Sequence, residues 1–228
     1  MKWISDFIDF ILPRHCAVCG EVLSRGEQEI CLNCLLALPL IDDAHCAEIE
    51  KLFWGIVPVE RAASYFYYRK GSPYINLLHR LKYKNRPQIG VLLAKNAATE
   101  LLPKGFFDGV ELIIPLPLSK KKERSRGYNQ CDYIAEGISQ VTGIPIGQGC
   151  VARTKANETQ THKNREERWK NVEGIFAVSN PDAVRGKHVL LIDDVLTTGA
   201  TIADCARALV AVGCRVTIFT LAYSSNTI

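Results

Sequence analysis

The sequence predicts an α/β domain built around a mostly parallel sheet and preceded by a small cysteine-rich module. Apolar segments of strand length alternate with segments of helical periodicity from about residue 59 onward. Four cysteines are grouped as two close pairs within residues 1–50. The 228 residues, of which 47% are hydrophobic and 23% charged, can bury one sizeable core and support one additional module.

The chain begins with an amphipathic segment. Its aromatic and aliphatic side chains fall on one helical face before Pro13, so we expect a helix that docks on the module behind it. Asp6 and Asp9 interrupt the apolar part and make it a poor export signal. No apolar run approaches the roughly 18 residues needed to cross a membrane. These features predict a cytoplasmic protein whose thiols stay reduced.

The paired cysteines follow. Cys16 and Cys19 form one Cys-x-x-Cys pair, and Cys31 and Cys34 form a second. Each pair can present two thiolates on a tight turn, and four thiolates suit a tetrahedral zinc ion. Because four protein ligands leave no open coordination position, we expect a structural zinc site in a module that covers residues 1–50.

Alternatives remain open at this cluster. The four cysteines could be buried or redox-active residues, or a nearby His15, His45 or Cys46 could replace one zinc ligand. The remaining cysteines have no partner at short spacing and are expected in the core: Cys131, Cys150, Cys205 and Cys214.

The residues from 51 to 228 alternate between strand and helix patterns. Strands are predicted at 59–68, 110–114, 187–193 and 215–222. Helices are predicted at 72–84, 87–102, 129–141 and 201–212. This order is typical of strands that run parallel with helices between them.

Two adjacent carboxylates end the third predicted strand. Asp193 and Asp194 follow the aliphatic run 189–192. Ligands of open parallel sheets bind at the carboxyl ends of strands. Each carboxylate can accept a charge-assisted hydrogen bond from a sugar hydroxyl, worth roughly 1.5–3 kcal/mol, or the two can surround a magnesium ion.

A turn of small residues follows, made of Thr197, Thr198, Gly199, Ala200 and Thr201. Backbone N–H groups at a helix N-terminus bind anions. The helix dipole contributes only about 0.3–1 kcal/mol, so the N–H groups and threonine hydroxyls must supply most of the binding. Hydroxyl-binding acids before a phosphate-binding turn predict a site for a ribose 5-phosphate, whereas the alternative is a capped helix beside solvated acids.

The stretch VLLIDDVLTTGAT, residues 189–201, resembles the phosphoribosyl-pyrophosphate (PRPP) motif of type I phosphoribosyltransferases. The resemblance implies a type I phosphoribosyltransferase-like parallel sheet flanked by helices. It also implies that Asp193 and Asp194 are catalytic residues that hold the ribose hydroxyls, that residues 197–201 hold the 5-phosphate, and that Mg²⁺ accompanies PRPP.

A basic segment follows the predicted strand 110–114. Five basic residues and one acidic residue lie between Lys120 and Arg126. We expect a loop whose cations, together with the backbone of Leu116, Pro117 and Leu118, meet the pyrophosphate. A solvated basic turn is the alternative.

The long polar segment 153–171 is the last candidate part of the site. A polar segment of this length within a compact domain is often a functional loop or a mobile lid. Its candidates for contacting the ligand are Arg153, Lys155, Gln160, Lys163, Arg165 and Arg168. A solvated charged helix is the alternative.

The order of these features resembles the ComF/GntX family, phosphoribosyltransferase-like proteins linked to DNA uptake in competent bacteria. The four-cysteine module comes first, and the stretches PLPLS and RSRGYNQ come next. Arg153, Gln160, Arg165 and Asn171 then match a family segment before the PRPP strand. Family members often add a second cysteine pair after the first four, where this chain has only Cys46.

Three functions stay open. The protein could be a type I phosphoribosyltransferase of unknown acceptor, or a regulator that senses PRPP and acts on a protein partner through the zinc module. It could also be a non-catalytic protein that handles single-stranded DNA, with the cations of 120–126 and 153–170 along the phosphates. Bases could then stack on the aromatic run 65–68, although alternate positions of a strand favour the core. A net charge of +4 is too small to decide.

Overall fold

The computed structural model describes residues 13–69, 71–154 and 174–224. The predicted N-terminal helix and several predicted ligand-contacting residues lie outside the described residues: Lys155, Gln160, Lys163, Arg165 and Arg168. Among the residues described, no helix combines the length and the apolar character that crossing a bilayer requires.

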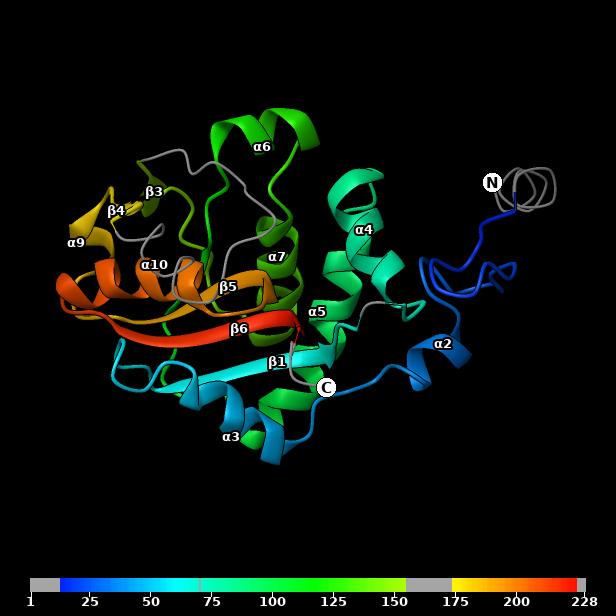
Figure 1. Cartoon of the computed structure of the whole chain (residues 1–228), viewed down its shortest axis with the longest axis horizontal. Helices are drawn as coiled ribbons and strands as arrows, with labels where there is room; N and C mark the ends of the chain where they lie inside the picture. The colour runs from blue at the N-terminus through cyan, green and yellow to red at the C-terminus, as the bar shows by residue number, and fades with distance from the viewer. Residues whose placement is uncertain (1–12, 70, 155–173, 225–228) are drawn as a thin grey trace.

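A four-stranded sheet in the order β1-β6-β5-β2 forms the centre of the molecule (Figure 1). Its strands are β1 (Arg61–Tyr67), β2 (Leu112–Pro115), β5 (His188–Leu196) and β6 (Arg215–Tyr223). All neighbours run parallel. The two central strands, β5 and β6, are buried along nearly their whole length, as expected for parallel strands covered on both faces.

Helices cover both faces of this sheet. Helices α5 (Gln88–Leu101) and α7 (Gln130–Thr142) pack on each other and on the sheet. Their close approach requires Gly137, because a Cβ there would lie 2.5 Å from the carbonyl oxygen of Val91. Helix α10 (Ala200–Ala211) connects β5 to β6, and the right-handed crossover rule places it on the opposite face.

Smaller elements surround this core. They are α2 (Leu32–Leu36), α3 (Asp43–Lys51), α4 (Ile75–Tyr83), the 3₁₀ turn η1 (Leu102–Lys104), α6 (Lys120–Arg126), α9 (Pro181–Val184), and the antiparallel strands β3 (Val151–Arg153) and β4 (Phe176–Val178). Figure 1 shows α6 and the β3–β4 pair beyond one edge of the sheet, and the cysteine module beyond α4. The predicted α/β fold with a parallel sheet, flanking helices and an N-terminal module is confirmed.

Strand β5 continues through both aspartates to Leu196, so its predicted end at residue 193 is wrong. The reason is its unequal neighbours. On the β2 side pairing stops at Pro115 and Ile192, whereas on the β6 side it continues to Leu196 and Tyr223. The two acids therefore lie on a strand that is still paired along one edge and open along the other.

The basic segment after β2 forms the helix α6, so the predicted loop is also wrong. The side chain of Ser119 caps the helix by accepting from the N–H of Lys122 at 3.4 Å. Gly127 ends it in the left-handed conformation, with φ at 81°. Lysine and arginine between these caps favour a helix and place their charges around its axis.

The predicted core residues are buried. The four unpaired cysteines Cys131, Cys150, Cys205 and Cys214 are all buried. In β1, Tyr65 is 7% exposed and Phe66 is 0% exposed, so these two rings of the aromatic run 65–68 belong to the core. These two rings therefore cannot stack on bases, and the favoured expectation that this run belongs to the core holds for both of them.

Candidate functional site

Asp194 is a buried carboxylate that the protein contacts on both oxygens. Its Oδ1 lies 3.0 Å from the Nζ of Lys82, and its Oδ2 accepts a hydrogen bond from the Nε2 of Gln130 at 2.6 Å. Lys82 comes from the last turn of α4 and Gln130 from the first residue of α7. Elements distant in the sequence thus meet at this one side chain.

Asp193 lies beside it in a different environment. Its Oδ1 accepts the backbone N–H of Asp194 at 2.8 Å and faces the thiol of Cys131 at 3.7 Å. Burial, followed by the charge of Asp194, raises the pKa of Asp193 to about 7, against the opposing effects of the N–H of Asp194 and of Lys82. Both acids therefore meet the first turn of α7, one through Gln130 and the other through Cys131.

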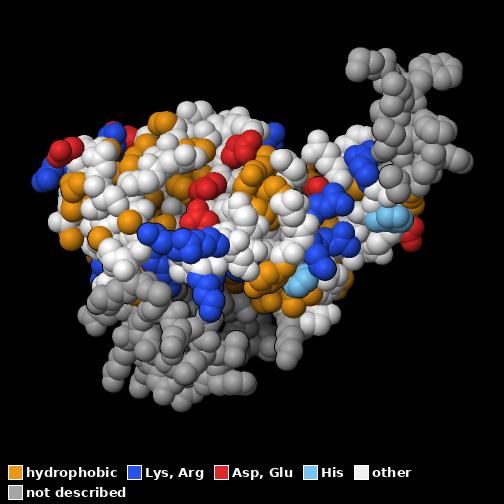
Figure 2. Space-filling model, turned by 90° about the horizontal axis from the view of Figure 1, so that it is seen from above, with side chains coloured by type: hydrophobic (Ala, Val, Ile, Leu, Met, Phe, Trp, Pro, Cys, Tyr) orange, Lys and Arg blue, Asp and Glu red, His pale blue; other side chains and the backbone are white. Residues whose placement is uncertain are grey.

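Basic side chains gather around the two acids. Lys122 on α6 is half-buried, and its pKa is lowered by burial and then by repulsion from Arg126, Arg153 and Lys82. Figure 2 looks onto the face that carries α6 and shows Lys and Arg side chains beside Asp and Glu side chains at its centre. Among the described residues these four cations outnumber Asp193 and Asp194, and still outnumber them when Asp204, which acts on Arg153, is counted, so the site favours an additional anion.

Arg126 is fixed by two contacts. Its Nη1 donates to the Oε1 of Gln130 at 2.6 Å, and its guanidinium lies 5.3 Å from the ring centroid of Tyr83 on α4. Because Gln130 also donates to Asp194, a continuous chain of contacts joins α6 to the acids of β5. The orientation of the glutamine amide is thereby set on both sides.

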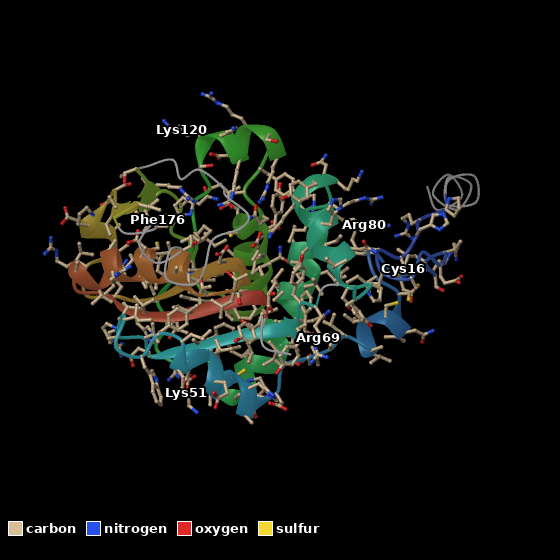
Figure 3. All side chains as sticks on the ribbon, viewed as in Figure 1. Cys16, Lys51, Arg69, Arg80, Lys120 and Phe176 are labelled. Carbon is tan, nitrogen blue, oxygen red and sulfur yellow. The ribbon has the colours of Figure 1, made fainter. Side chains whose placement is uncertain are left out.

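Arg153 closes the site from the β3–β4 pair. Its guanidinium lies 5.4 Å from the ring centroid of Phe176, which is labelled in Figure 3. Asp204 of α10 holds this strand pair in place by accepting the backbone N–H groups of Gly174 and Ile175 at 2.9 and 2.8 Å. The Nε of Arg153 is buried and has no hydrogen-bond partner among the described residues. A buried donor left in this state costs free energy, so a ligand acceptor at Arg153 would be favoured.

The predicted phosphate turn lies at the start of α10. Gly199 precedes the helix with φ at 76°, and a Cβ at this residue would lie 3.3 Å from a ring carbon of Phe53. No side chain caps the helix at Gly199, and the N–H of Ala200 reaches only the Oγ1 of Thr198, at 3.5 Å. Since the first amides of a helix lack intrahelical acceptors, this turn offers N–H groups to an anion.

The segment after β2 offers less backbone than predicted. The N–H of Leu116 donates to the carbonyl of Ile192 at 2.9 Å, and Pro117 has no N–H. Of the three residues Leu116, Pro117 and Leu118, only Leu118 has a backbone N–H that is not donated to β5. Pro117 and Leu118 border a cleft of about 240 Å³ between β2, α6 and α7.

Four cysteines come together in the N-terminal module. The Sγ atoms of Cys16, Cys19, Cys31 and Cys34 all lie within 4.8 Å of one another, and Figure 3 shows this module at the far end of the molecule from Phe176. A set of four thiolates at this spacing fits the tetrahedral coordination of zinc.

Backbone hydrogen bonds to Cys16 favour the thiolate form that binds a metal. The Sγ of Cys16 accepts the N–H groups of Val18 and Cys31, each at 3.4 Å. Burial opposes ionisation, but these hydrogen bonds outweigh it and hold the pKa of Cys16 below its ordinary value. The possible substitute ligands lie apart from the cluster: His15 bonds to Gly20, His45 bonds to Asp42, and Cys46 is on α3.

Some residues of the site are not evident from the sequence. Lys82 and Gln130 act through contacts between segments far apart in the chain, so no local pattern names them. A weak signal exists for Lys82, because it follows Leu78 by four residues and so shares the buried side of an amphipathic helix. Gln130 lies within the stretch RSRGYNQ, which had suggested a site without saying which side chain would contact the acids.

Two family models match separate parts of the chain. The model of the double zinc ribbon domain matches residues 7–61, and the model of the phosphoribosyl transferase domain matches residues 134–227. The described residues contain one four-cysteine cluster. The rest of the matched range contains α3, where Cys46 is the one further cysteine.

Curated relatives match most of the chain. DNA utilization protein YhgH of Salmonella typhimurium is 29% identical over 199 residues, which cover 85% of this chain and 83% of that protein. Competence protein F of Haemophilus influenzae is 29% identical over 196 residues, 86% of this chain and 78% of that protein. Competence protein ComFC of Bacillus subtilis is 34% identical over 146 residues, 63% of this chain and 57% of that protein.

Solved structures show a more distant likeness. The allosteric regulatory enzyme of purine biosynthesis is 20% identical with a TM-score of 0.39, and the match covers 61% of this chain but only 29% of that enzyme. Adenine phosphoribosyltransferase from Leishmania tarentolae is 14% identical with a TM-score of 0.36, covering 62% of this chain and 73% of that one. At these TM-scores the likeness says nothing about the site or the activity of this chain.

The cysteine cluster, the phosphoribosyl transferase domain and the named relatives agree with the order of features in the sequence. A structural zinc site lies in the N-terminal module, and a parallel sheet with a paired-acid motif follows it. Over most of its length the chain is thus similar to DNA utilization and competence proteins, and it combines a double zinc ribbon match with a phosphoribosyl transferase domain match, in the order that the resemblance to the ComF/GntX family led us to expect.

Proposed function

We propose that this protein binds PRPP, or a related ribose phosphate, together with Mg²⁺ and transfers the phosphoribosyl group to an acceptor. One observation carries the proposal. Two carboxylates on the side of β5 left open by β2 precede an uncapped helix N-terminus in the chain, and half-buried cations act on them, Lys82 on Asp194 and Arg153 with Asp193. That combination suits a molecule with hydroxyl groups in the middle and phosphates at both ends.

The roles of the residues follow from their places. Asp193 and Asp194 accept hydrogen bonds from the ribose hydroxyls. For this, the contact between Asp194 and the ammonium of Lys82 must break. Thr197, Thr198 and Thr201 with the first amides of α10 hold the 5-phosphate. The carboxylate oxygens also suit Mg²⁺, which would supply positive charge to the leaving pyrophosphate.

The cations act on the pyrophosphate end. When pyrophosphate leaves C1 of the ribose, negative charge grows on its oxygens, and preorganised donors stabilise that charge. Lys122 and Arg153 suit this role, because both are half-buried and the Nε of Arg153 has no described protein acceptor. Further candidates in 155–171 lie outside the described residues and stay predictions.

Calorimetry of PRPP binding in the presence of Mg²⁺ tests this function. Asp193→Asn combined with Asp194→Asn should weaken binding by at least about tenfold, since charge-assisted hydrogen bonds to the ribose are lost. Asp182→Asn on α9, an exposed acid outside the site, is the matched control and should bind like wild type. Equal affinity in all three proteins would contradict the proposal.

Release of pyrophosphate separates an enzyme from a sensor. Incubation of wild-type protein with PRPP, Mg²⁺ and a panel of nucleobases should release pyrophosphate with at least one of them if transfer occurs. Tight binding without release across the panel would favour the regulator hypothesis, in which PRPP binding controls a partner of the zinc module.

A specific surface favours a second candidate function, binding of single-stranded DNA. Tyr83 at the end of α4 is 62% exposed, and its ring centroid lies 5.2 Å from that of His79. Exposed basic residues follow Tyr83 in the chain, and others lie on α6, whose Arg126 contacts the Tyr83 ring: Lys84, Arg86, Lys120, Lys121 and Arg124. An exposed aromatic surface beside cations suits stacked bases and their phosphates. The names of the relatives, DNA utilization protein and competence protein, agree with a role of this kind.

The salt dependence of oligo-dT binding tests this second candidate. Arg124→Gln should weaken binding and reduce the slope of log affinity against log salt by roughly 0.7 if it removes one phosphate contact. Tyr83→Ala should weaken binding without changing that slope, because it removes a stacking surface and no charge. A flat slope for the wild-type protein would reject this surface as a nucleic-acid site.

A further inference from the structure

A buried ion pair is a costly feature at the end of α4. The helix buries Leu77, Leu78 and Leu81, yet its next residue, Lys82, points its ammonium at the protein interior with its side chain only 20% exposed. Burial is the largest single effect and lowers the pKa of Lys82, but the charge and hydrogen bond of Asp194 together with the charge of Asp193 outweigh it, so the pKa lies above its ordinary value. Apolar residues of similar size often stabilise a protein as well as such a pair does, so stability alone does not explain it.

The position of the ammonium gives a better explanation. Gln130 already donates to the Oδ2 of Asp194, so Oδ1 is the oxygen that remains, and Lys82 lies 3.0 Å from it. A divalent cation bound to Asp194 needs that same oxygen. Like charges repel, so Lys82 and a cation cannot share it.

We propose that Lys82 is a built-in counter-ion that occupies the cation position on Asp194 in the ligand-free protein and is displaced when a divalent cation arrives with the ribose phosphate. The identity of the ligand rests on the function proposed above, whereas the exchange of ammonium for metal does not. Lysine suits this role, because its charge is compact and its four-carbon stem is flexible.

The charges around Lys82 determine which ligand favours its displacement from Asp194. Asp194 and then Asp193 attract the ammonium of Lys82, while Arg126 repels it. The charge of Lys82 in turn contributes to lowering the pKa of Lys122. Once Lys82 leaves Asp194, the described cations lose one of the acids that neutralise them. A ligand that brings phosphates together with the metal therefore favours the displaced state more than the metal alone.

Binding of Mn²⁺ without any ribose phosphate tests the exchange. Lys82→Gln should bind Mn²⁺ about tenfold more tightly than wild type if the pair is open in roughly one molecule in ten, because the competitor is gone. Lys84→Gln is the matched control, since Lys84 is exposed at the end of the same helix, and its Mn²⁺ affinity should equal that of wild type. Calorimetry or electron paramagnetic resonance gives these affinities. Equal affinity of the Lys82→Gln variant and wild type would overturn the proposal.

Measurement on the wild-type protein covers the case in which Lys82→Gln does not fold. The ¹⁵N signal of the Lys82 ammonium should be sharp in the ligand-free protein, because its protons are held by Asp194, and saturating Mg²⁺ should shift or broaden it. A signal that saturating Mg²⁺ leaves unchanged would overturn the exchange.

The two proposals fail separately. If Lys82→Gln raises Mn²⁺ affinity but wild type does not bind PRPP, the counter-ion role stands and the proposed function is wrong. If wild type binds PRPP with Mg²⁺ but Lys82→Gln leaves Mn²⁺ affinity unchanged, the function stands and the counter-ion role is wrong.

Discussion

Asp193 and Asp194 are neighbours in the chain but are held in opposite ways. Asp194 meets an ammonium and an amide, whereas Asp193 meets a backbone N–H, a thiol and the charge of its neighbour. Two carboxylates this close disfavour ionising together. The ligand-free site therefore keeps one acid paired and raises the pKa of the other.

The raised pKa of Asp193 predicts how stability depends on pH. The folded pKa is about 7, against roughly 3.9 for an unperturbed aspartate, so between these values the folded state binds more protons than the unfolded state. The contribution of this group is therefore fully present below about pH 4 and is lost as pH rises through about 7. Asp193→Asn removes that dependence.

Urea unfolding at pH 5 and pH 8 measures the effect. The variant should gain stability relative to wild type as the pH goes from 5 to 8, because only wild type must ionise a buried carboxyl. A difference between the two proteins that is the same at both pH values would show that the pKa of Asp193 is not raised.

Gly199 supports a second prediction at this scale. Its φ of 76° and the 3.3 Å approach of a Cβ to Phe53 mean that Gly199→Ala should lower the free energy of unfolding by about 1 kcal/mol or more. It should also weaken binding of ribose 5-phosphate, because the turn shifts. Gly186→Ala is the control, with φ at 74° and no atom within 4 Å. It should lose stability but keep its phosphate affinity, and equal phosphate affinity in both variants would contradict the role of the turn.

Some of these site residues could be predicted from the sequence. Spacing alone names the two acids and the turn, because those residues are contiguous and their backbone conformation is local. Lys82 and Gln130 could not be assigned, since their contacts with Asp194 arise only when α4, α7 and β5 pack together.

At the scale of elements, helix α4 joins the zinc module to the candidate site. At its start the hydroxyl of Tyr74 donates to the carbonyl of Cys34 at 3.1 Å, and at its end Lys82 meets Asp194. A further ion pair, between Arg86 and Glu29 at 3.4 Å, ties the residues after α4 to the same module. Zinc bound by the four cysteines would therefore also support one end of the helix that carries Lys82.

Zinc content tests the metal cluster. Cys31→Ser should lose the approximately one zinc per chain that four thiolates hold, and its thermal unfolding temperature should fall, because metal binding contributes to folding free energy. Cys46→Ser should keep its zinc, since Cys46 lies on α3 and outside the cluster. Elemental analysis of the purified variants measures this, and full zinc retention by Cys31→Ser would contradict the assignment.

Strong periodicity explains which elements could be predicted. The helices near 87–102 and 129–141 match α5 and α7, because each buries a regular apolar face. The strand near 215–222 matches β6, because it is a short run that is buried on both faces. Helix α6 has no buried residue, so its two caps were the only local evidence. Strands β3 and β4 have three residues each, too few for a pattern to stand out from a polar segment.

At the scale of the whole molecule, topology explains where the site lies. Because β2, β5 and β6 are parallel, their carboxyl ends lie at the same end of the sheet. The pairing with β2 stops before β5 ends, so the last residues of β5 have no strand partner on that side. Helix α6 and the β3–β4 pair follow β2 in the chain, and Figure 1 shows them above β5, on the side of the sheet opposite β1. The fold thus brings the acids, the cations and the start of α10 together.

The N-terminal module also contacts this sheet. Pro39 accepts from the N–H of Tyr67 at 2.8 Å, and the N–H of Ile41 donates to Tyr65 at 3.0 Å, so the chain runs along the free edge of β1. Helix α3 then packs beside the same strand. An edge strand covered in this way is protected from pairing with other chains. The proposed boundary near residue 50 stays a prediction.

A crystal structure of the wild-type protein with PRPP and Mg²⁺ tests the central claim most directly. We expect the ribose hydroxyls within hydrogen-bonding distance of Asp193 and Asp194, the 5-phosphate on the amides that begin α10, and the ammonium of Lys82 moved away from Asp194. A ligand bound elsewhere, with the 3.0 Å contact between Lys82 and Asp194 intact, would contradict it.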